Sequence, residues 1–247
     1  MELYHWEPNA DSLKLIIALK EKAIPFESRY VDLLALEHHG EAYRKAADFD
    51  RVPLLVDQGE PLKDSQFALQ YLAEAYGPRL APSDPAGWYD VQAWTGVLDQ
   101  TFRANVRLLG WHLVTSPGMG EAQRKAFLDG SASLPREGVQ AGWDQVTSDA
   151  EASEDQLANA RERIGAGVDR LEAALQGSDW LLGDAYSVVD INAFAHVHTL
   201  PRLTPELVNP ERTPRLIAWL ARVGERQAVK DALAMAKSPT DSYAPAV

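Results

Sequence analysis

The sequence contains no cysteine among its 247 residues. This absence excludes disulfide bonds, thiolate metal sites and a cysteine nucleophile in the chain itself. Thiol chemistry would therefore need a thiol that a cosubstrate brings in. The chain also lacks a charged and then apolar leader at its N-terminus, and no apolar run approaches the ~18 residues of a membrane-spanning helix. We therefore expect a cytoplasmic, soluble protein with no membrane partner.

Positive charge is scarce relative to negative charge. The 24 Lys and Arg residues face 36 Asp and Glu residues, which gives a formal net charge of −12. A surface of this sign repels nucleic acid and anionic lipid, so neither is expected as a partner. His196 and His198 stand two residues apart, on different faces of one expected helix, and lack metal-ligand spacing. We expect no metal site and interpret both histidines as structural.

The most informative stretch combines a short apolar strand at 52–56, a turn at 57–59 and a second, returning strand. Asp64 and Ser65 follow, just before a helix with apolar residues at roughly helical spacing. Pro53 stands at the start of the first strand, where proline is tolerated at a sheet edge or in a cis turn. The unit is therefore Val-Pro, hairpin, Asp-Ser and helix.

The residues before this unit predict a strand at 2–6, a helix at 13–22 and a strand at 25–31. A strand, helix and strand within about thirty residues form a βαβ unit, so these strands should be parallel. A short helical segment at 37–47 leads to the hairpin. The whole order, β-α-β-α-β-β-α, is that of a thioredoxin-like domain, although the Cys-x-x-Cys of thioredoxin-like redox proteins is absent.

A proline-rich stretch at 78–87 is expected to be a linker. It separates the thioredoxin-like domain at 1–77 from a region at 88–240 in which apolar residues recur at helical spacing. The expected fold class is therefore α/β plus all-α, with a helical bundle as the second domain. Between 115 and 153 the apolar positions are scattered, and we expect broken helices or an excursion over the surface there.

The second domain carries several helix signals, among them a capping-box pattern with Asp in place of Glu and a proline at a first helical position. The expected features are long helices at 88–113 and 157–175, the box of Ser187 and Asp190, a helix that Thr213 caps with Pro214 at its first position, and a last helix at 226–237.

These motifs together resemble the glutathione S-transferases. In that family a Val-Pro pair with a cis bond precedes the third strand, and an acidic residue followed by Ser holds the γ-glutamyl end of glutathione. A buried capping box after a Leu-x-Gly turn also occurs there, with a role in folding. The resemblance covers nearly the whole chain and implies glutathione as cosubstrate.

The resemblance also implies individual glutathione contacts. The backbone of Val52, shaped by Pro53, would pair with the cysteinyl backbone, and Asp64 with Ser65 would hold the γ-glutamyl end. His39 would bind the glycyl carboxylate. The alternatives remain open: an Asp-Ser pair before an apolar helix is often only a cap, and His39 fits an exposed loop equally well.

The thiolate donor is expected in the turn after the first strand. Ser12 is the leading candidate and Asn9, whose amide can donate, is the second. Asp11 would oppose a thiolate while ionised and is interpreted as a helix cap. The alternative is that all three residues only cap the helix.

A closer resemblance is to the bacterial glutathione-dependent β-aryl etherases of lignin breakdown. It rests on Leu3-Tyr4, the turn at 8–14, Gly110-Trp111-His112 and the end at 226–230. In that group the thiolate attacks the carbon that bears an aryl ether next to a ketone, and a phenol leaves. The turn serine of the group matches Ser12. Candidates for an aromatic substrate pocket, each of which could instead be a core residue, are Trp6, Pro8, Phe102, Trp111, His112 and Trp143.

Two features depart from that group. It commonly has Asn-Pro-x-Gly-x where this chain has 47–51, and Arg51 could instead pair with a glutathione carboxylate. It commonly has Asn where this chain has Asp11. A transferase for another electrophile and a non-catalytic transferase-like subunit therefore remain as alternatives. The family usually dimerises, so we expect a homodimer, with a heterodimer with a related chain as the alternative.

Overall fold

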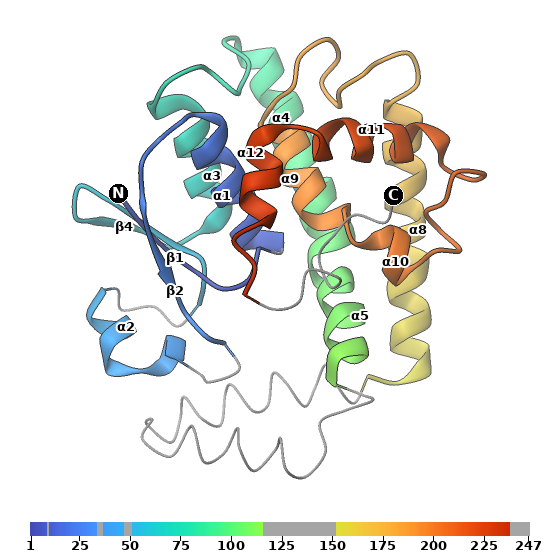
Figure 1. Ribbon diagram of the computed structural model, residues 1–247. Coiled ribbons are helices and arrows are strands. Elements are labelled where there is room, and N and C mark those ends of the chain that lie inside the picture. Colours follow the sequence, from blue (N-terminus) through green and yellow to red (C-terminus); the bar gives the residue numbers. More distant parts are fainter. Residues whose placement is uncertain (9, 34–36, 47–50, 116–151, 238–247) are drawn as a thin grey trace.

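The computed structural model describes residues 1–8, 10–33, 37–46, 51–115 and 152–237, without the side chains of residues 39 and 111–115. Figure 1 shows a small sheet with its helices beside a larger group of helices. The first part contains β1 (Glu2–His5), α1 (Ala10–Glu21), β2 (Glu27–Tyr30), η1 (Glu37–His39), α2 (Glu41–Ala46), β3 (Leu54–Asp57), β4 (Glu60–Leu62) and α3 (Ser65–Ala75). The second contains α4 (Pro85–Leu98), η2 (Asp99–Arg103), α5 (Ala104–Thr115), α8 (Glu154–Ala174), α9 (Val188–Val197), α10 (Leu200–Leu203), α11 (Pro214–Gly224) and α12 (Gln227–Leu233).

The sheet has the order β2-β1-β3-β4. β1 and β2 run parallel, with Glu2 opposite Glu27, while β3 is antiparallel to both β1 and β4. The predicted βαβ unit and the thioredoxin-like order are thus confirmed. The turn between β3 and β4 places Gln58 at φ 52° and Gly59 at φ 88°, which matches a tight hairpin turn with two left-handed residues.

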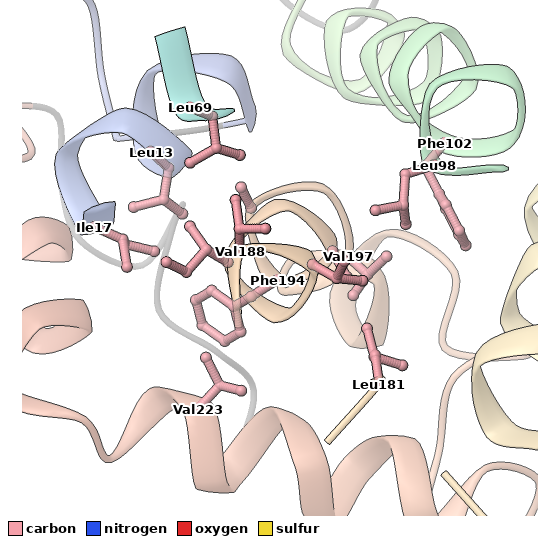
Figure 2. Packing of buried hydrophobic residues seen from close by; sticks show 14 of the residues in the cluster. Leu13, Ile17, Leu69, Leu98, Phe102, Leu181, Val188, Phe194, Val197 and Val223 are labelled. Atoms are coloured by element: carbon pink, nitrogen blue, oxygen red, sulfur yellow. The ribbon is translucent and has the colours of Figure 1, made fainter. Parts of the chain in front are cut away.

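Helix α1 lies at the boundary between the two parts of the molecule (Figure 1) and contacts α3, α9 and α12. All residues from Ser12 to Leu19 are buried. Figure 2 shows Leu13 and Ile17 of α1, with Leu69 of α3, facing Val188 and Phe194 of α9. One continuous apolar core therefore joins the sheet domain to the helical domain.

A bidentate ion pair reinforces this boundary. Arg226, just before α12, donates to both carboxylate oxygens of Glu21 at 2.6 and 2.8 Å. The same guanidinium lies 3.7 Å from the ring centroid of Tyr186, a cation–π distance. The end of α1 is thereby fixed to the start of α12.

The long helix expected at 88–113 is longer and less regular than predicted. It begins at Pro85, inside the stretch interpreted as linker, because Asp84 accepts a hydrogen bond from the Gly87 amide at 3.0 Å and proline suits the first helical position. The helical path then passes through the π-helical η2 before it continues as α5. The expected broken helices at 115–153 lie almost wholly outside the described residues.

The predicted capping box at the start of α9 is confirmed. The Asp190 carboxylate accepts hydrogen bonds from the Ser187 amide at 3.0 Å and from the Leu181 amide at 3.0 Å. It also accepts from the indole N–H of Trp219 at 2.9 Å. This one fully buried side chain therefore joins α9, α11 and the preceding loop.

Thr213 does not cap α11 with its side chain, contrary to the prediction. Its hydroxyl accepts from the Asn209 amide at 3.2 Å and donates to the Asn209 carbonyl at 3.1 Å. Thr213 stands at the N-cap position, but its hydroxyl forms hydrogen bonds with the preceding turn instead of with the first turn of α11. No helix of the described residues is long and apolar enough to span a bilayer.

Asp190→Ala is expected to lower the free energy of unfolding by about 3 kcal/mol or more, because it leaves several buried donors without an acceptor. Chemical denaturation would measure the change. Asp179→Ala is the control, because the Asp179 side chain is 71% exposed and pairs only at the surface. Equal losses of unfolding free energy from the two substitutions would contradict the role of Asp190 as a buried hydrogen-bond acceptor.

The two buried histidines of α9 predict an acid-sensitive stability. Burial lowers the pKa of His196 to about 3 and that of His198 to about 4. Each histidine is protonated in the unfolded chain below about pH 6.5 but stays neutral in the folded chain. The free energy of unfolding therefore has its full value above about pH 6.5 and falls as the pH drops toward 4. His198→Gln should show a shallower fall, by up to about 3 kcal/mol at pH 4. Denaturation at several pH values would measure it, and parallel curves for the two proteins would contradict it.

Candidate functional site

The start of α3 combines a strong cap with an unpaired hydroxyl. The Asp64 carboxylate accepts hydrogen bonds from the backbone amides of Gln66 at 2.8 Å and Phe67 at 2.9 Å. Ser65 is 5% exposed, and its hydroxyl has no hydrogen-bond partner within the described part of the chain. A buried hydroxyl without a partner costs free energy, and at a helix N-terminus it lies where an anion is favoured. The arrangement suits the carboxylate of a ligand.

The start of α1 places Ser12 in the first helical turn, where the residue is 3% exposed. Asn9, the other proposed thiolate donor, lies outside the described residues. Asp11 lies inside this turn and, contrary to the cap interpretation, forms ion pairs with side chains. Its carboxylate pairs with the Lys14 ammonium at 2.7 Å and with the Arg103 guanidinium at 2.9 Å.

These pairs keep Asp11 ionised. Burial alone would raise the pKa of its carboxyl group, but the charges of Lys14 and Arg103 outweigh burial and hold that pKa well below its usual range. The same contact raises the pKa of Arg103, against the effect of its partial burial. A carboxylate and two cations therefore lie beside the first turn of α1.

Lys14 also connects the two helix starts. Its side chain is 1% exposed, and its ammonium donates to the Gln66 side-chain oxygen at 3.4 Å. Gln66 in turn donates to the Thr95 hydroxyl of α4 at 3.3 Å. Lys14 is the fifth residue of α1 and Gln66 is the second residue of α3, so the two helix N-termini lie near each other.

The turn between β1 and α1 is held by a buried carboxylate. Glu7 is 1% exposed and accepts from the Tyr30 hydroxyl at 2.7 Å and from the Lys237 amide at 2.9 Å. Pro8 beside it is buried and Trp6 is half-buried. No sequence signal indicates this brace, because its partners are far apart in the chain.

The other proposed glutathione contacts lie along the approach to β3. The Val52–Pro53 peptide bond is cis, as the resemblance implied. Arg51 is exposed, and its carbonyl accepts a hydrogen bond from the Tyr43 hydroxyl. Val52 is half-buried and Pro53 is buried. The backbone of His39 is in η1, but its side chain is outside the described residues.

Phe102 is a core residue, which corrects its proposed place in a substrate pocket. It is fully buried in η2, and a Cβ on Gly167 of α8 would come within 2.6 Å of its ring. The absence of a side chain at Gly167 is what lets the ring approach α8 so closely. Trp143 and the side chains of Trp111 and His112 lie outside the described residues.

Sequence reasoning missed Lys14, Gln66 and Arg103. The i, i+3 spacing of Asp11 and Lys14 is a local signal that could have been found. Arg103 comes from a distant helix and gives no such signal. Two surface hollows in the described part of the chain lie beside Arg226 and Arg222 and include neither Ser12 nor Ser65. The candidate site is defined by the two helix starts.

Residues 12–75 match the family model described as glutathione S-transferase, N-terminal domain. Residues 138–227 match the model described as glutathione S-transferase, C-terminal domain.

Individual relatives match along most of their length. Protein LigF of Sphingobium sp. is 29% identical over 240 residues, which cover 94% of this chain and 92% of LigF. A glutathione S-transferase of Hyoscyamus muticus is 25% identical over 224 residues, 90% of this chain and 92% of that protein.

Solved structures of related proteins also match along most of their length. The crystal structure of the beta-etherase LigF from Sphingobium sp. matches with a TM-score of 0.80 at 29% identity, covering 94% of this chain and 98% of that one. A glutathione transferase of Burkholderia graminis, with two glutathione molecules bound per subunit, matches with a TM-score of 0.73 at 24% identity, covering 96% and 89%. The latter likeness shows the fold.

Two buried serines at helix starts should respond differently to substitution. Ser65 and Ser187 are each 5% exposed, but only Ser187 has hydrogen-bond partners among the described residues. Ser187→Ala should cost about 1–3 kcal/mol of unfolding free energy, whereas Ser65→Ala should change it by less than about 0.5 kcal/mol. Chemical denaturation would test this, and an equal loss at both sites would show that Ser65 serves the fold.

Proposed function

Because the chain belongs to the glutathione S-transferase family, we propose that it binds glutathione across the starts of α1 and α3 and uses the thiolate to cleave β-aryl ethers. The substrates would be lignin-derived aromatics with a ketone next to the ether-bearing carbon. A phenol would be released and a glutathione thioether would remain on the aromatic product.

The observation that carries the proposal is the side-chain hydrogen bond that joins the N-terminal parts of α1 and α3. Lys14, the fifth residue of α1, and Gln66, the second residue of α3, are joined by a hydrogen bond of 3.4 Å. Glutathione presents a carboxylate at its γ-glutamyl end and a thiol at its centre, and both become more stable as anions at a helix N-terminus. Two adjacent N-termini with Ser12 and Ser65 in their first turns fit these two groups.

The proposed roles follow the chain. Ser12 would donate its hydroxyl to the thiolate, with Asn9 as the second donor. A free thiol has a pKa near 8.5, and a helix N-terminus with one hydroxyl donor would lower it by about a unit or more. The remaining contacts with glutathione would come from His39, Arg51, Val52, Pro53, Asp64 and Ser65.

The chemistry requires little beyond the thiolate and orientation. The sulfur would attack the carbon that bears the aryl ether, so that a C–S bond forms and the C–O bond breaks. The oxygen leaves with the bonding electrons as a phenolate and takes a proton from water. The neighbouring ketone activates the carbon, so the protein mainly supplies proximity and a stabilised nucleophile. The aromatic rings would contact Trp6, Pro8, Trp111, His112 and Trp143.

The likeness to LigF, whose structure is named a beta-etherase, supports this substrate class. The second candidate function is conjugation of glutathione to another electrophile. It is favoured by relatives named only as glutathione S-transferases, such as the Hyoscyamus muticus protein and glutathione S-transferase F10 of Arabidopsis thaliana at 26% identity. A dimer, of identical or related chains, is part of the proposal in either case.

The decisive assay incubates the protein with glutathione and an α-keto β-aryl ether, and measures the released phenol and the thioether by chromatography. Equal amounts of both products are expected. Turnover of other electrophiles without any phenol would overturn the etherase function and leave the transferase one.

Ser12→Ala should lower kcat by about 100-fold while glutathione still binds, because the lost hydrogen bond acts on the thiolate. Ser65→Ala is the matched variant and should instead weaken glutathione binding by roughly tenfold. Steady-state kinetics and calorimetry would separate the two effects. A Ser12→Ala enzyme with the original kcat would exclude Ser12 as the thiolate donor.

A further inference from the structure

We propose that Asp11, Lys14 and Arg103 form a charge cluster that tunes the ionisation of the glutathione thiol at the start of α1, with Arg103 as a positioning residue that acts through Asp11. This inference rests on the proposed function, because the thiol in question is that of bound glutathione. It assigns a role in the reaction to a residue of the helical domain that does not touch the sulfur.

The carboxylate of Asp11 is adjacent in sequence to the proposed thiolate donor, Ser12, in the same helical turn. An ionised carboxylate near a thiol opposes the loss of the thiol proton, and neighbouring like charges commonly raise a pKa by about a unit or more. Left uncompensated, Asp11 would therefore cancel the advantage of the helix N-terminus.

Two cations compensate this carboxylate from different elements. The Lys14 ammonium lies 2.7 Å from Asp11 Oδ1, and the Arg103 side chain donates to Oδ2 from Nε at 3.0 Å and from Nη2 at 2.9 Å. Lys14 is 1% exposed, so its charge is little screened by water. Each carboxylate oxygen thus has its own cation.

The remaining groups near the cluster do not replace these cations. Asp99 also forms an ion pair with Arg103 at 3.3 Å, but the Asp99 side chain is 54% exposed and water screens its charge. His196 of α9 is fully buried and neutral near pH 7, because burial lowers its pKa to about 3. Gln66 of α3 is uncharged. Removal of Arg103 would therefore leave Asp11 with Lys14 as its one paired cation among the described residues.

Arg103 reaches Asp11 from the π-helical η2. Its neighbour Phe102 packs on Gly167 of α8, while Arg103 itself pairs across the domain boundary with α1. Adjacent residues thus contact helices that belong to different domains. π-helical turns recur at functional sites. Here the turn places Phe102 in the hydrophobic core and Arg103 in the charge cluster.

Two substitutions should move the thiol pKa in opposite directions. Arg103→Gln removes a cation and should raise the pKa of the bound glutathione thiol by roughly half a unit to one unit. Below that pKa, kcat/KM should fall by about three- to tenfold and recover at higher pH.

Asp11→Asn removes the carboxylate while its amide oxygen can still accept from Lys14, and should lower the thiol pKa by a similar amount. The ultraviolet absorbance of the thiolate, titrated with saturating glutathione, would measure both shifts.

Controls separate charge from structure. Arg103→Lys keeps the charge and should keep the thiol pKa close to that of the original protein. Arg212→Gln is the matched control on the helical domain, because Arg212 is 35% exposed and pairs with Asp169 at 2.8 Å away from the cluster. It should change neither the thiol pKa nor kcat/KM.

The outcomes are distinct. Shifts of opposite sign in Arg103→Gln and Asp11→Asn support the inference. Shifts of the same sign, or a loss of kcat at every pH with an unchanged thiol pKa, would overturn it and leave the cluster a purely structural role. If calorimetry shows that the original protein does not bind glutathione, the proposed function and this inference fail together. If glutathione binds and titrates but no phenol is released, only the ether cleavage fails.

Discussion

Burial of α1 between the sheet and the helical domain is the constraint on which the rest of the structure depends. The helix is covered from Ser12 to Leu19, so every side chain in that run must find its partners inside the protein. Most are apolar and pack on α9 and α3. Lys14 is the one charged residue in this run, and a buried ammonium needs both a counter-ion and hydrogen-bond acceptors. The contacts with Asp11 and Gln66 meet that need, and they bring the starts of two helices together.

Local signals in the sequence predicted the parts of the fold that local chemistry controls. The Val-Pro pair, the Asp64 cap and the box of Ser187 and Asp190 each have a short-range cause, and each is present in the structure. The parallel β1–β2 pair followed from the length of its connection. The helix start at Pro85 was misplaced, because prolines suggested a linker where one of them occupies the first helical position.

Long-range pairs could not be read from the sequence in the same way. Asp11 and Arg103 are 92 positions apart, and nothing in either neighbourhood indicates the other. Phe102 illustrates a related difficulty, because an aromatic residue at helical spacing fits a pocket and a core equally well. Phe102 is a core residue because Gly167, on a helix distant in the sequence, leaves room for its ring. Thr213 was misread because two turns compete for one hydroxyl, and only the folded chain shows which turn has it.

The hydrogen bond between Glu7 and the amide of Lys237 has a consequence for biosynthesis. Lys237, which lies 230 positions after Glu7, braces the turn that leads into α1, and Arg226 secures the other end of the same helix. While the ribosome is still making the helical region, the first domain lacks both supports. The nascent sheet domain therefore emerges with its key helix only partly held, and the final dozen residues before position 238 complete its anchorage.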